Sequence, residues 1–183
     1  MASDMRHSAN HRPLTPVMED YLETIYDIGQ EKTFVRVKDI AGRLNVKMPT
    51  VTSMLKTLRE RGLVHYGKYE YVELTSTGTE VGREMRRRHE ILLQFLTHVL
   101  KIEPQVADQE ACKMEHALSE ETLSSLTDFM HFIQVCPRAG DKWLEYFEEY
   151  RQQGKSPDKC RARGKDFSCE FVNQIKSVSD PES

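Results

Sequence analysis

The segment EACKMEHALS, residues 110–119, carries three side chains that can bind a metal ion. Cys112, Glu115 and His116 fall at positions i, i+3 and i+4. In a helix this spacing places a thiolate, a carboxylate and an imidazole on one face, because residues three and four apart are neighbours on the helix surface. Three donors on one face would form half of a metal site.

Other donors occur in two further segments. Asp20 and Glu23 lie three residues apart in MEDYLE, and His89 follows a run of three arginines. Taken singly, a cysteine is most often a buried thiol and a glutamate most often a solvated charge. Together with the first three, these residues make six candidate ligands on three expected helices.

Apolar residues at helical spacing indicate the helices that would carry these donors. We expect a first helix over residues 15–30 and a long helix over about 76–100. A third should begin at Pro104 and end near Ser119, which is suited to cap a last helix. The apolar positions are Val17, Tyr21, Ile25 and Ile28 in the first helix, and Leu123, Leu126, Phe129 and Ile133 in the last.

The residues between the first helix and the long helix predict a DNA-binding unit. A short helix over 37–44, a turn at Asn45 and a second helix ending at Gly62 make a helix-turn-helix. Two short segments rich in Val, Tyr and Leu follow, and Gly67 separates them as in a β-hairpin, or wing. The expected fold is therefore mainly α, with an N-terminal winged helix-turn-helix followed by an all-helical metal-binding and dimerisation domain.

Basic charge gathers in this unit, although the whole chain has a net charge of -3. Between Arg36 and Lys68 cations outnumber acids. Short polar groups on the second helix can approach bases, and cations beside them can neutralise phosphates. Some helix-turn-helix units bind no nucleic acid, but this order of elements with local basic charge favours DNA binding. The candidate contacts are Arg36, Lys47, Thr50, Thr52, Ser53, Lys56 and Arg59.

Length and composition predict a soluble protein without a membrane-spanning helix. The 183 residues suffice for one or two domains, and no apolar run approaches the roughly 20 residues of a membrane-spanning helix. We expect a flexible arm (1–13), a winged helix (14–75), the helical domain (76–135) and a C-terminal helix and tail (136–183). No apolar segment typical of a signal peptide follows the N-terminus, so we expect a cytoplasmic location. Cys136, Cys160 and Cys169 could form a second thiolate site, but their spacing favours plain thiols.

From Leu14 to Phe132 the chain resembles the diphtheria toxin repressor family of iron- and manganese-dependent regulators. The motifs MEDYLETIY, VRVKDIAGRLNVKMPTVTSMLKTLRERGLV, LTSTG, RRRHEILLQFL and EACKMEHALS occur in the family's order and spacing. The resemblance implies that the regulatory metal ligands are Asp20, Glu23, His89, Cys112, Glu115 and His116. It also implies that the base-facing end of the recognition helix consists of Pro49, Thr50, Thr52 and Ser53.

This sequence departs from the family pattern at informative positions. Iron-sensing members tend to have Met at the place of Asp20, and manganese-sensing members tend to have Glu at the place of Cys112. A soft thiolate favours Fe(II) over Mn(II), although other divalent transition metals should bind in vitro. Leu93 replaces a carboxylate of an ancillary site, which we therefore do not expect. We also expect a short form without the SH3-like domain of longer members.

The expected function is metal-dependent repression of metal-homeostasis genes, with operator DNA as partner and no enzymatic activity. The apolar stripes of the later helices predict a homodimer. One alternative is a winged-helix regulator that does not respond to metal. A less favoured alternative is a metallohydrolase, since a Glu beside a His can serve as a general base. Its zinc-binding helix would need two His at i and i+4 with Glu between them, whereas Cys112 heads this set.

Overall fold

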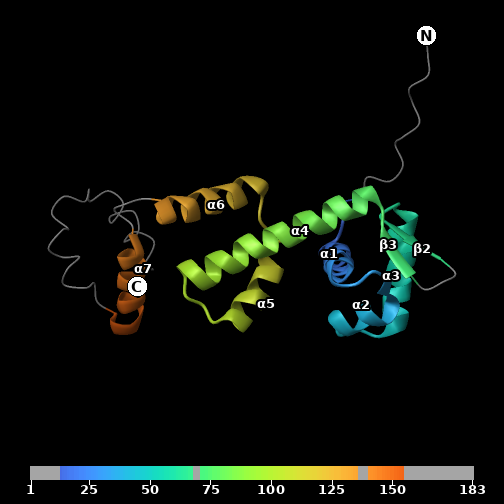
Figure 1. Cartoon of the computed structure of the whole chain (residues 1–183), viewed down its shortest axis with the longest axis horizontal. Coiled ribbons are helices and arrows are strands. Elements are labelled where there is room, and N and C mark those ends of the chain that lie inside the picture. The colour runs from blue at the N-terminus through green and yellow to red at the C-terminus, as the bar shows by residue number, and fades with distance from the viewer. Residues whose placement is uncertain (1–12, 68–70, 136–139, 155–183) are drawn as a thin grey trace, which may run out of the picture. The chain divides into compact units, whose positions relative to one another are not determined.

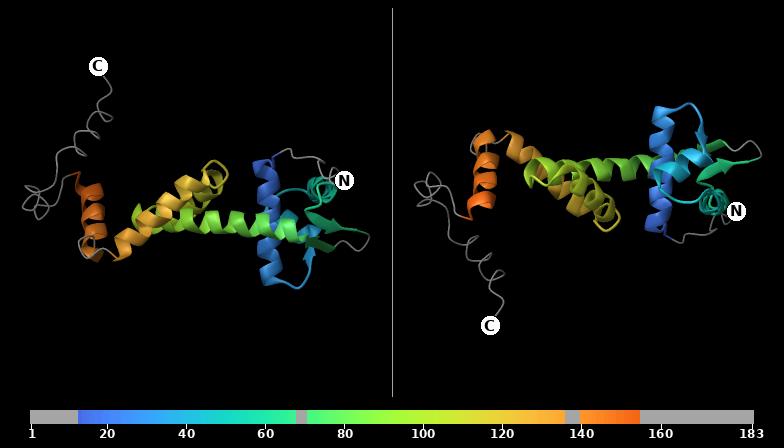
Figure 2. Two further views of the ribbon diagram at one scale, coloured as in Figure 1. Left: turned by 90° about the horizontal axis from the view of Figure 1, so that it is seen from above. Right: turned by 90° about the horizontal axis from the view of Figure 1, so that it is seen from below.

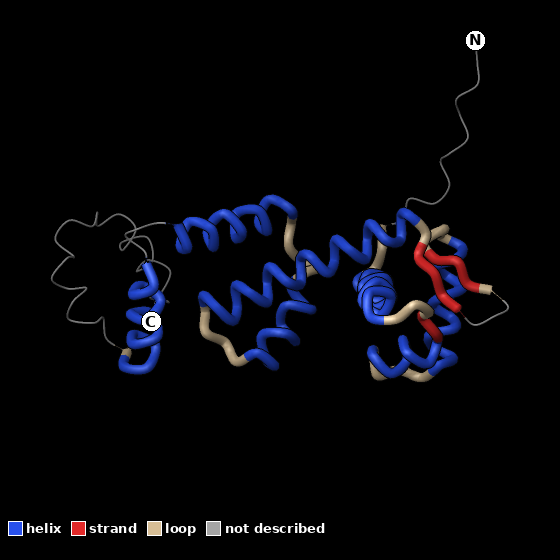
Figure 3. The backbone as a smooth tube through the Cα atoms, in the orientation of Figure 1, coloured by secondary structure: helices blue, strands red, loops and turns tan. Residues whose placement is uncertain are grey.

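The computed structural model describes residues 13–67, 71–135 and 140–154, and it divides into two units, 1–128 and 129–183. Each unit is described by itself. Helices dominate, and the strands are confined to a small sheet (Figures 1 and 3). The elements are α1 (Pro16–Glu31), β1 (Val35–Arg36), α2 (Val37–Arg43), α3 (Met48–Glu60), β2 (Val64–Tyr66), β3 (Tyr71–Leu74), α4 (Ser76–Gln94), the π-helical turn η1 (Phe95–Val99), α5 (Pro104–Met114), α6 (Glu120–Val135) and α7 (Gly140–Gln153). The expected mainly helical fold with a winged helix-turn-helix is confirmed.

The winged helix is built from α1, α2, α3 and the sheet. Thr15 caps α1 by accepting a hydrogen bond from the Met18 backbone N–H. Asn45, at a φ of 53°, makes the left-handed turn between α2 and α3. Gly62, at a φ of 73°, makes the left-handed turn that follows α3. The sheet has the order β1-β3-β2 with antiparallel pairs. The hairpin β2–β3 was expected from the sequence, whereas β1 was not, because two residues are too few for an alternating pattern.

One apolar core holds this unit together. The buried faces of α1, α2 and α3 meet the inner residues of the sheet. Fully burying one such side chain stabilises the fold by about 1.5–3 kcal/mol. Its fully buried residues include Leu22, Ile25, Ile28, Ile40, Val51, Leu55 and Leu58.

The helix α4 links the winged helix to the helices that follow, and α1 packs across it (Figure 2). The two backbones come close at Gly82. A Cβ atom there would lie 2.7 Å from the Leu22 carbonyl oxygen and 2.8 Å from the Tyr26 Cβ atom. The helix expected over about 76–100 is observed from Ser76 to Val99, but its last part, Phe95–Val99, forms η1 instead of α-helix.

The helix α5 is shorter than the sequence suggested. It ends at Met114, and Glu115 is its C-terminal cap, whereas we expected it to continue to about Ser119. Arg88 explains the change, because its guanidinium donates hydrogen bonds to the backbone carbonyls of Leu118 and Glu115 and holds that turn against α4. As expected, Ser119 accepts a hydrogen bond from the Thr122 backbone N–H at the start of α6.

A helix after Pro137 was expected, and α7 is that helix. Cys136, Cys160, Cys169 and Lys68 lie outside the described residues, as does most of the expected arm. None of the described helices is long and apolar enough to cross a membrane.

Candidate metal centre and DNA-binding face

A buried carboxylate, that of Glu115, lies at the centre of the candidate metal site. Its side chain is fully buried. Its Oε2 lies 2.9 Å from His89 Nδ1 on α4, and its Oε1 lies 3.4 Å from His116 Nε2. Oε1 has no hydrogen-bond partner among the described residues. Leaving a buried carboxylate oxygen without a partner costs free energy, so this atom indicates a missing positive ligand.

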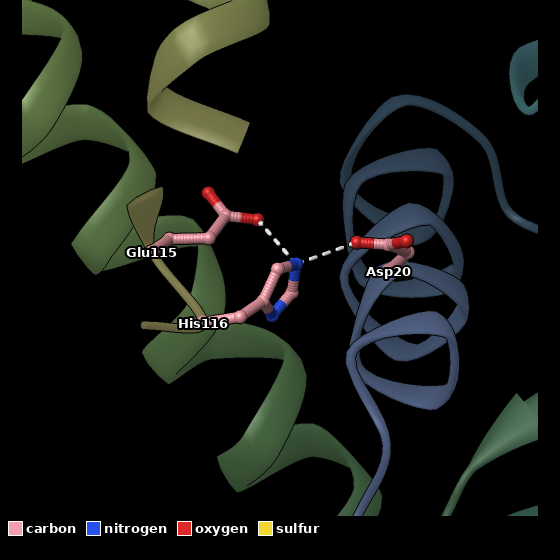
Figure 4. Close-up of side chains that lie close together, drawn as sticks. All are labelled: Asp20, Glu115 and His116. Atoms are coloured by element: carbon pink, nitrogen blue, oxygen red, sulfur yellow. Dashed lines mark hydrogen bonds and ion pairs between the residues drawn. The ribbon is translucent and has the colours of Figure 1, made fainter. Parts of the chain in front are cut away.

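The helix α1 contributes the opposite wall of the site. Asp20 Oδ1 lies 2.7 Å from His116 Nε2, so this imidazole nitrogen faces carboxylates from two elements (Figure 4). Donor atoms of Asp20, Glu115 and His116 lie within 4.8 Å of one another. Donor atoms of Glu23, His89 and Glu115 form a second group of the same size. The two groups share Glu115 and draw ligands from α1, α4 and the end of α5.

The proton affinities of these groups reflect their crowding. Burial and the neighbouring Glu115 raise the pKa of Glu23 to about 7. The hydrogen bond with Glu115 raises the pKa of His89 despite the opposing effect of burial. Burial lowers the pKa of His116, but its hydrogen bonds with Glu19 and Asp20 outweigh that effect and raise it. The site therefore holds more carboxylates than the imidazoles of His89 and His116 can neutralise.

These residues fit a divalent metal ion. Carboxylates and imidazoles are ligands of first-row transition metals, and the set offers both. A cation would also compensate the buried charge of Glu115 and satisfy its Oε1. Five of the six expected ligands belong to the two groups: Asp20, Glu23, His89, Glu115 and His116.

Cys112 is the expected ligand that belongs to neither group. It is an exposed free cysteine on α5. Partial desolvation and the nearby carboxylates of Glu115, Asp20 and Glu23 raise the pKa of its thiol to about 11. This raised pKa keeps the thiol protonated at neutral pH in the metal-free protein.

Two further carboxylates reach the same imidazoles and were not among the expected residues. Glu19 Oε2 lies 2.8 Å from His116 Nδ1, and Asp108 Oδ1 lies 3.2 Å from His89 Nε2. The sequence held a weak signal for both. Glu19 adjoins Asp20, and Asp108 lies one helical turn before Cys112.

The candidate DNA-binding residues lie on or beside α3. Thr50, Ser53 and Lys56 are exposed, whereas Thr52 is half-buried. Val51, Leu55 and Leu58 of the same helix are fully buried, so the polar face points away from the core. Lys47 is the N-terminal cap of α3, and Pro49 lies in its first turn.

Two of the candidate arginines make contacts within the winged helix. Arg59 donates a hydrogen bond to the Tyr66 backbone carbonyl of β2. The Arg36 guanidinium lies 5.5 Å from the centre of the Tyr71 ring, and that ring contacts Phe34. Of the expected cations, Arg59 on α3 thus contacts β2, and Arg36 on β1 contacts β3.

The fold and the side-chain groups together define a class of protein, a winged-helix protein with a candidate metal site of carboxylates and imidazoles. Two family models match the chain. One is described as the iron dependent repressor N-terminal DNA binding domain and matches residues 13–72; the other is described as the iron dependent repressor metal binding and dimerisation domain and matches residues 75–144.

Curated relatives agree with these matches. The transcriptional regulator MntR of Escherichia coli O157:H7 is 41% identical over 113 residues, which are 62% of this chain and 72% of the relative. An uncharacterised HTH-type transcriptional regulator of Methanocaldococcus jannaschii is 39% identical over 114 residues, which are 62% of this chain and 91% of the relative. The chain belongs to the iron-dependent repressor family of transcription regulators.

Solved structures show the same arrangement. The manganese regulator SloR matches with a TM-score of 0.58 and 31% identity over 68% of this chain and 58% of its own. ScaR with bound Zn²⁺ matches with a TM-score of 0.52 and 30% identity over 66% of this chain and 56% of its own. The chain therefore spans little more than half the length of these two structures. ScaR, which is similar to this chain, thus binds Zn²⁺ in its solved structure.

Proposed function

We propose that this protein is a metal-activated repressor that binds operator DNA as a homodimer and controls genes of metal homeostasis. The observation that carries the proposal is the buried Glu115 carboxylate between donor groups of α1 and α4. Asp20, Glu23, His89, Glu115 and His116 would hold the ion. Cys112 remains a sixth candidate. Its raised pKa keeps the thiol protonated without metal, but metal coordination requires the thiolate and would remove this proton.

A bound divalent cation supplies the positive charge that the buried carboxylates lack. Asp20 and Glu23 belong to α1, which is part of the winged helix, whereas Glu115 and His116 belong to the end of α5. Without a cation, the crowded carboxylates of Glu23 and Glu115 repel each other, which weakens the contact that His116 makes between α1 and the end of α5. Once this repulsion is neutralised, the α1 carboxylates hold the winged helix in one orientation relative to α4 and α5.

A fixed orientation is what a dimeric DNA-binding protein requires. Two recognition helices must reach successive half-sites, which are about 34–36 Å apart on the duplex. Changing a conformational population from 1:99 to 99:1 requires about 5.5 kcal/mol of differential binding energy. Several charged ligand bonds suffice for this amount. On each recognition helix, Thr50, Thr52 and Ser53 would face bases, and Lys47 and Lys56 would contact phosphates.

The family match to a dimerisation domain supports the homodimer. On α6, Phe132 is 57% exposed and Val135 is 60% exposed, and they lie one helical turn apart. Exposed apolar side chains that adjoin one another are candidates for a contact between subunits. Sedimentation should show a dimer at micromolar concentration. A monomer with and without metal would exclude this part of the proposal.

The metal proposed is Fe(II) or Mn(II), with Fe(II) first if Cys112 is a ligand. The test is an anaerobic titration of DNA binding with Fe(II), Mn(II), Co(II) and Zn(II), on a duplex selected from a random library. His116→Ala should leave the protein folded but abolish the metal response. DNA binding that is equal with and without metal would favour a regulator that does not respond to metal.

A further inference from the structure

The two imidazoles of the metal centre share a feature that its ligand set does not explain. Each ring has one nitrogen toward Glu115, at the centre of the site, and the other toward a carboxylate at its edge. For His89 the inner nitrogen is Nδ1, and for His116 it is Nε2. The edge carboxylates are Asp108 at 3.2 Å from His89 Nε2 and Glu19 at 2.8 Å from His116 Nδ1.

A neutral imidazole has a single N–H group, and the other nitrogen carries the lone pair that binds a metal. In the metal-free structure carboxylates face both nitrogens of each ring, with Glu115 at 2.9 Å from His89 Nδ1 and Asp20 at 2.7 Å from His116 Nε2. When a metal ion occupies the centre, the inner nitrogen must supply its lone pair to the ion. The edge carboxylate, which can only accept a hydrogen bond, then holds the N–H on the outer nitrogen. Such a partner also fixes the ring orientation and increases the basicity of the nitrogen that binds. Glu19 and Asp108 occupy the position of such a partner, next to the outer nitrogen of each ring.

We propose that Glu19 and Asp108 are positioning residues that set opposite tautomers in the two histidines, so that His116 presents Nε2 and His89 presents Nδ1 to the metal ion. Neither carboxylate is itself a ligand in this arrangement. The inference rests on the proposed metal centre and goes beyond its ligand set.

The two contacts should differ in strength. The Glu19 side chain is 22% exposed and its contact is short, whereas the Asp108 side chain is 64% exposed and its contact is longer. Hydrogen bonds exposed to water contribute less than sheltered ones, because water replaces the lost partner. Glu19 should therefore control His116 more tightly than Asp108 controls His89.

The direct test is ¹⁵N NMR of the full-length protein loaded with Zn(II), a diamagnetic probe, with ¹⁵N-labelled histidine. We expect the N–H of His116 on Nδ1 and the N–H of His89 on Nε2. The reverse tautomer in either ring would overturn the assignment for that ring. Failure of the wild-type protein to bind Zn(II) or Mn(II) would instead count against the proposed metal centre.

Substitution gives a second readout, the affinity and stoichiometry of Mn(II) binding. Loss of such a partner typically lowers metal affinity by about 10–100-fold. We expect Glu19→Ala to fall within this range and Glu19→Gln to lose less, because the amide oxygen still accepts a hydrogen bond. Asp108→Asn should cause a smaller loss. In all three variants the number of bound ions should be unchanged.

Glu110→Gln is the matched control for charge. Glu110 is exposed on α5 and lies two positions after Asp108, which places it about 200° away around the helix. It should bind Mn(II) as the wild type does. Unchanged affinity in Glu19→Ala would overturn the proposal, and so would a lower stoichiometry in Asp108→Asn, because that result would make Asp108 a ligand. Thermal unfolding of each metal-free variant verifies that it is folded.

Discussion

Replacing Gly82 by alanine should weaken metal binding although residue 82 touches no candidate ligand. The new Cβ would lie 2.7 Å from the Leu22 carbonyl oxygen, about 0.7 Å short of the 3.4 Å at which ordinary contact begins. Leu22 lies between Asp20 and Glu23 in α1, and the oxygen that the new Cβ would meet belongs to the backbone, not to a flexible side chain. The methyl group must therefore push α1 and its two carboxylates away from α4.

The substitution should change the free energy of unfolding and the Mn(II) affinity by different amounts. Overpacking costs about 1–3 kcal/mol, and alanine recovers about 1 kcal/mol over glycine within a helix. The free energy of unfolding should thus fall by about 0–2 kcal/mol. A metal site tolerates displacements of only about 0.5 Å, so Mn(II) affinity should fall at least about tenfold, which equals about 1.4 kcal/mol.

Calorimetric titration with Mn(II) and urea unfolding of the metal-free protein measure the two effects. Gly42→Ala in α2 is the control, because a Cβ there meets nothing within 4 Å. That variant should gain a little stability and keep its metal affinity. Wild-type Mn(II) affinity in Gly82→Ala would refute the idea that the crossing of α1 and α4 sets the geometry of the site.

Three other predictions concern protons, DNA and metal choice. Glu23 and His89 have raised pKa values in the metal-free fold, so both bind more protons there than in the unfolded chain. Stability of the metal-free protein should therefore decrease as pH rises through about 7, while Mn(II) affinity increases, which unfolding and titration between about pH 6 and about pH 8 will measure. Lys56→Ala should weaken binding to all duplexes alike and lower the salt slope by about one unit; a sequence-selective loss with an unchanged slope would contradict a phosphate contact. Cys112→Glu should shift activation toward Mn(II); an unchanged ratio of Fe(II) to Mn(II) activation constants would show that the thiol does not select the metal.

Much of this fold could be predicted because its signals are local. The spacing of Val51, Leu55 and Leu58 defines the buried face of the recognition helix, and Thr15 and Asn45 mark where helices begin and turn. Candidate metal donors were also evident from spacing and from the family motifs. The fold class and the family followed from these features together.

Other features depend on contacts between distant residues. The early end of α5 follows from Arg88, which lies 30 residues before its partner Leu118. Glu19 contacts His116 across 97 positions. Periodicity along one helix carries no information about such contacts. For the same reason, the helical spacing of Cys112, Glu115 and His116 did not reveal that α5 ends between Cys112 and Glu115.

The central claim is that metal and operator DNA bind cooperatively through the position of α1. The most direct test is linkage: Mn(II) affinity measured with and without a saturating duplex, and duplex affinity measured with and without Mn(II). Thermodynamics requires one coupling factor for both measurements. The account predicts that this factor is well above one in the wild type and close to one in Glu115→Gln, which keeps the size of the side chain but removes its charge. A factor of one in the wild-type protein would contradict it.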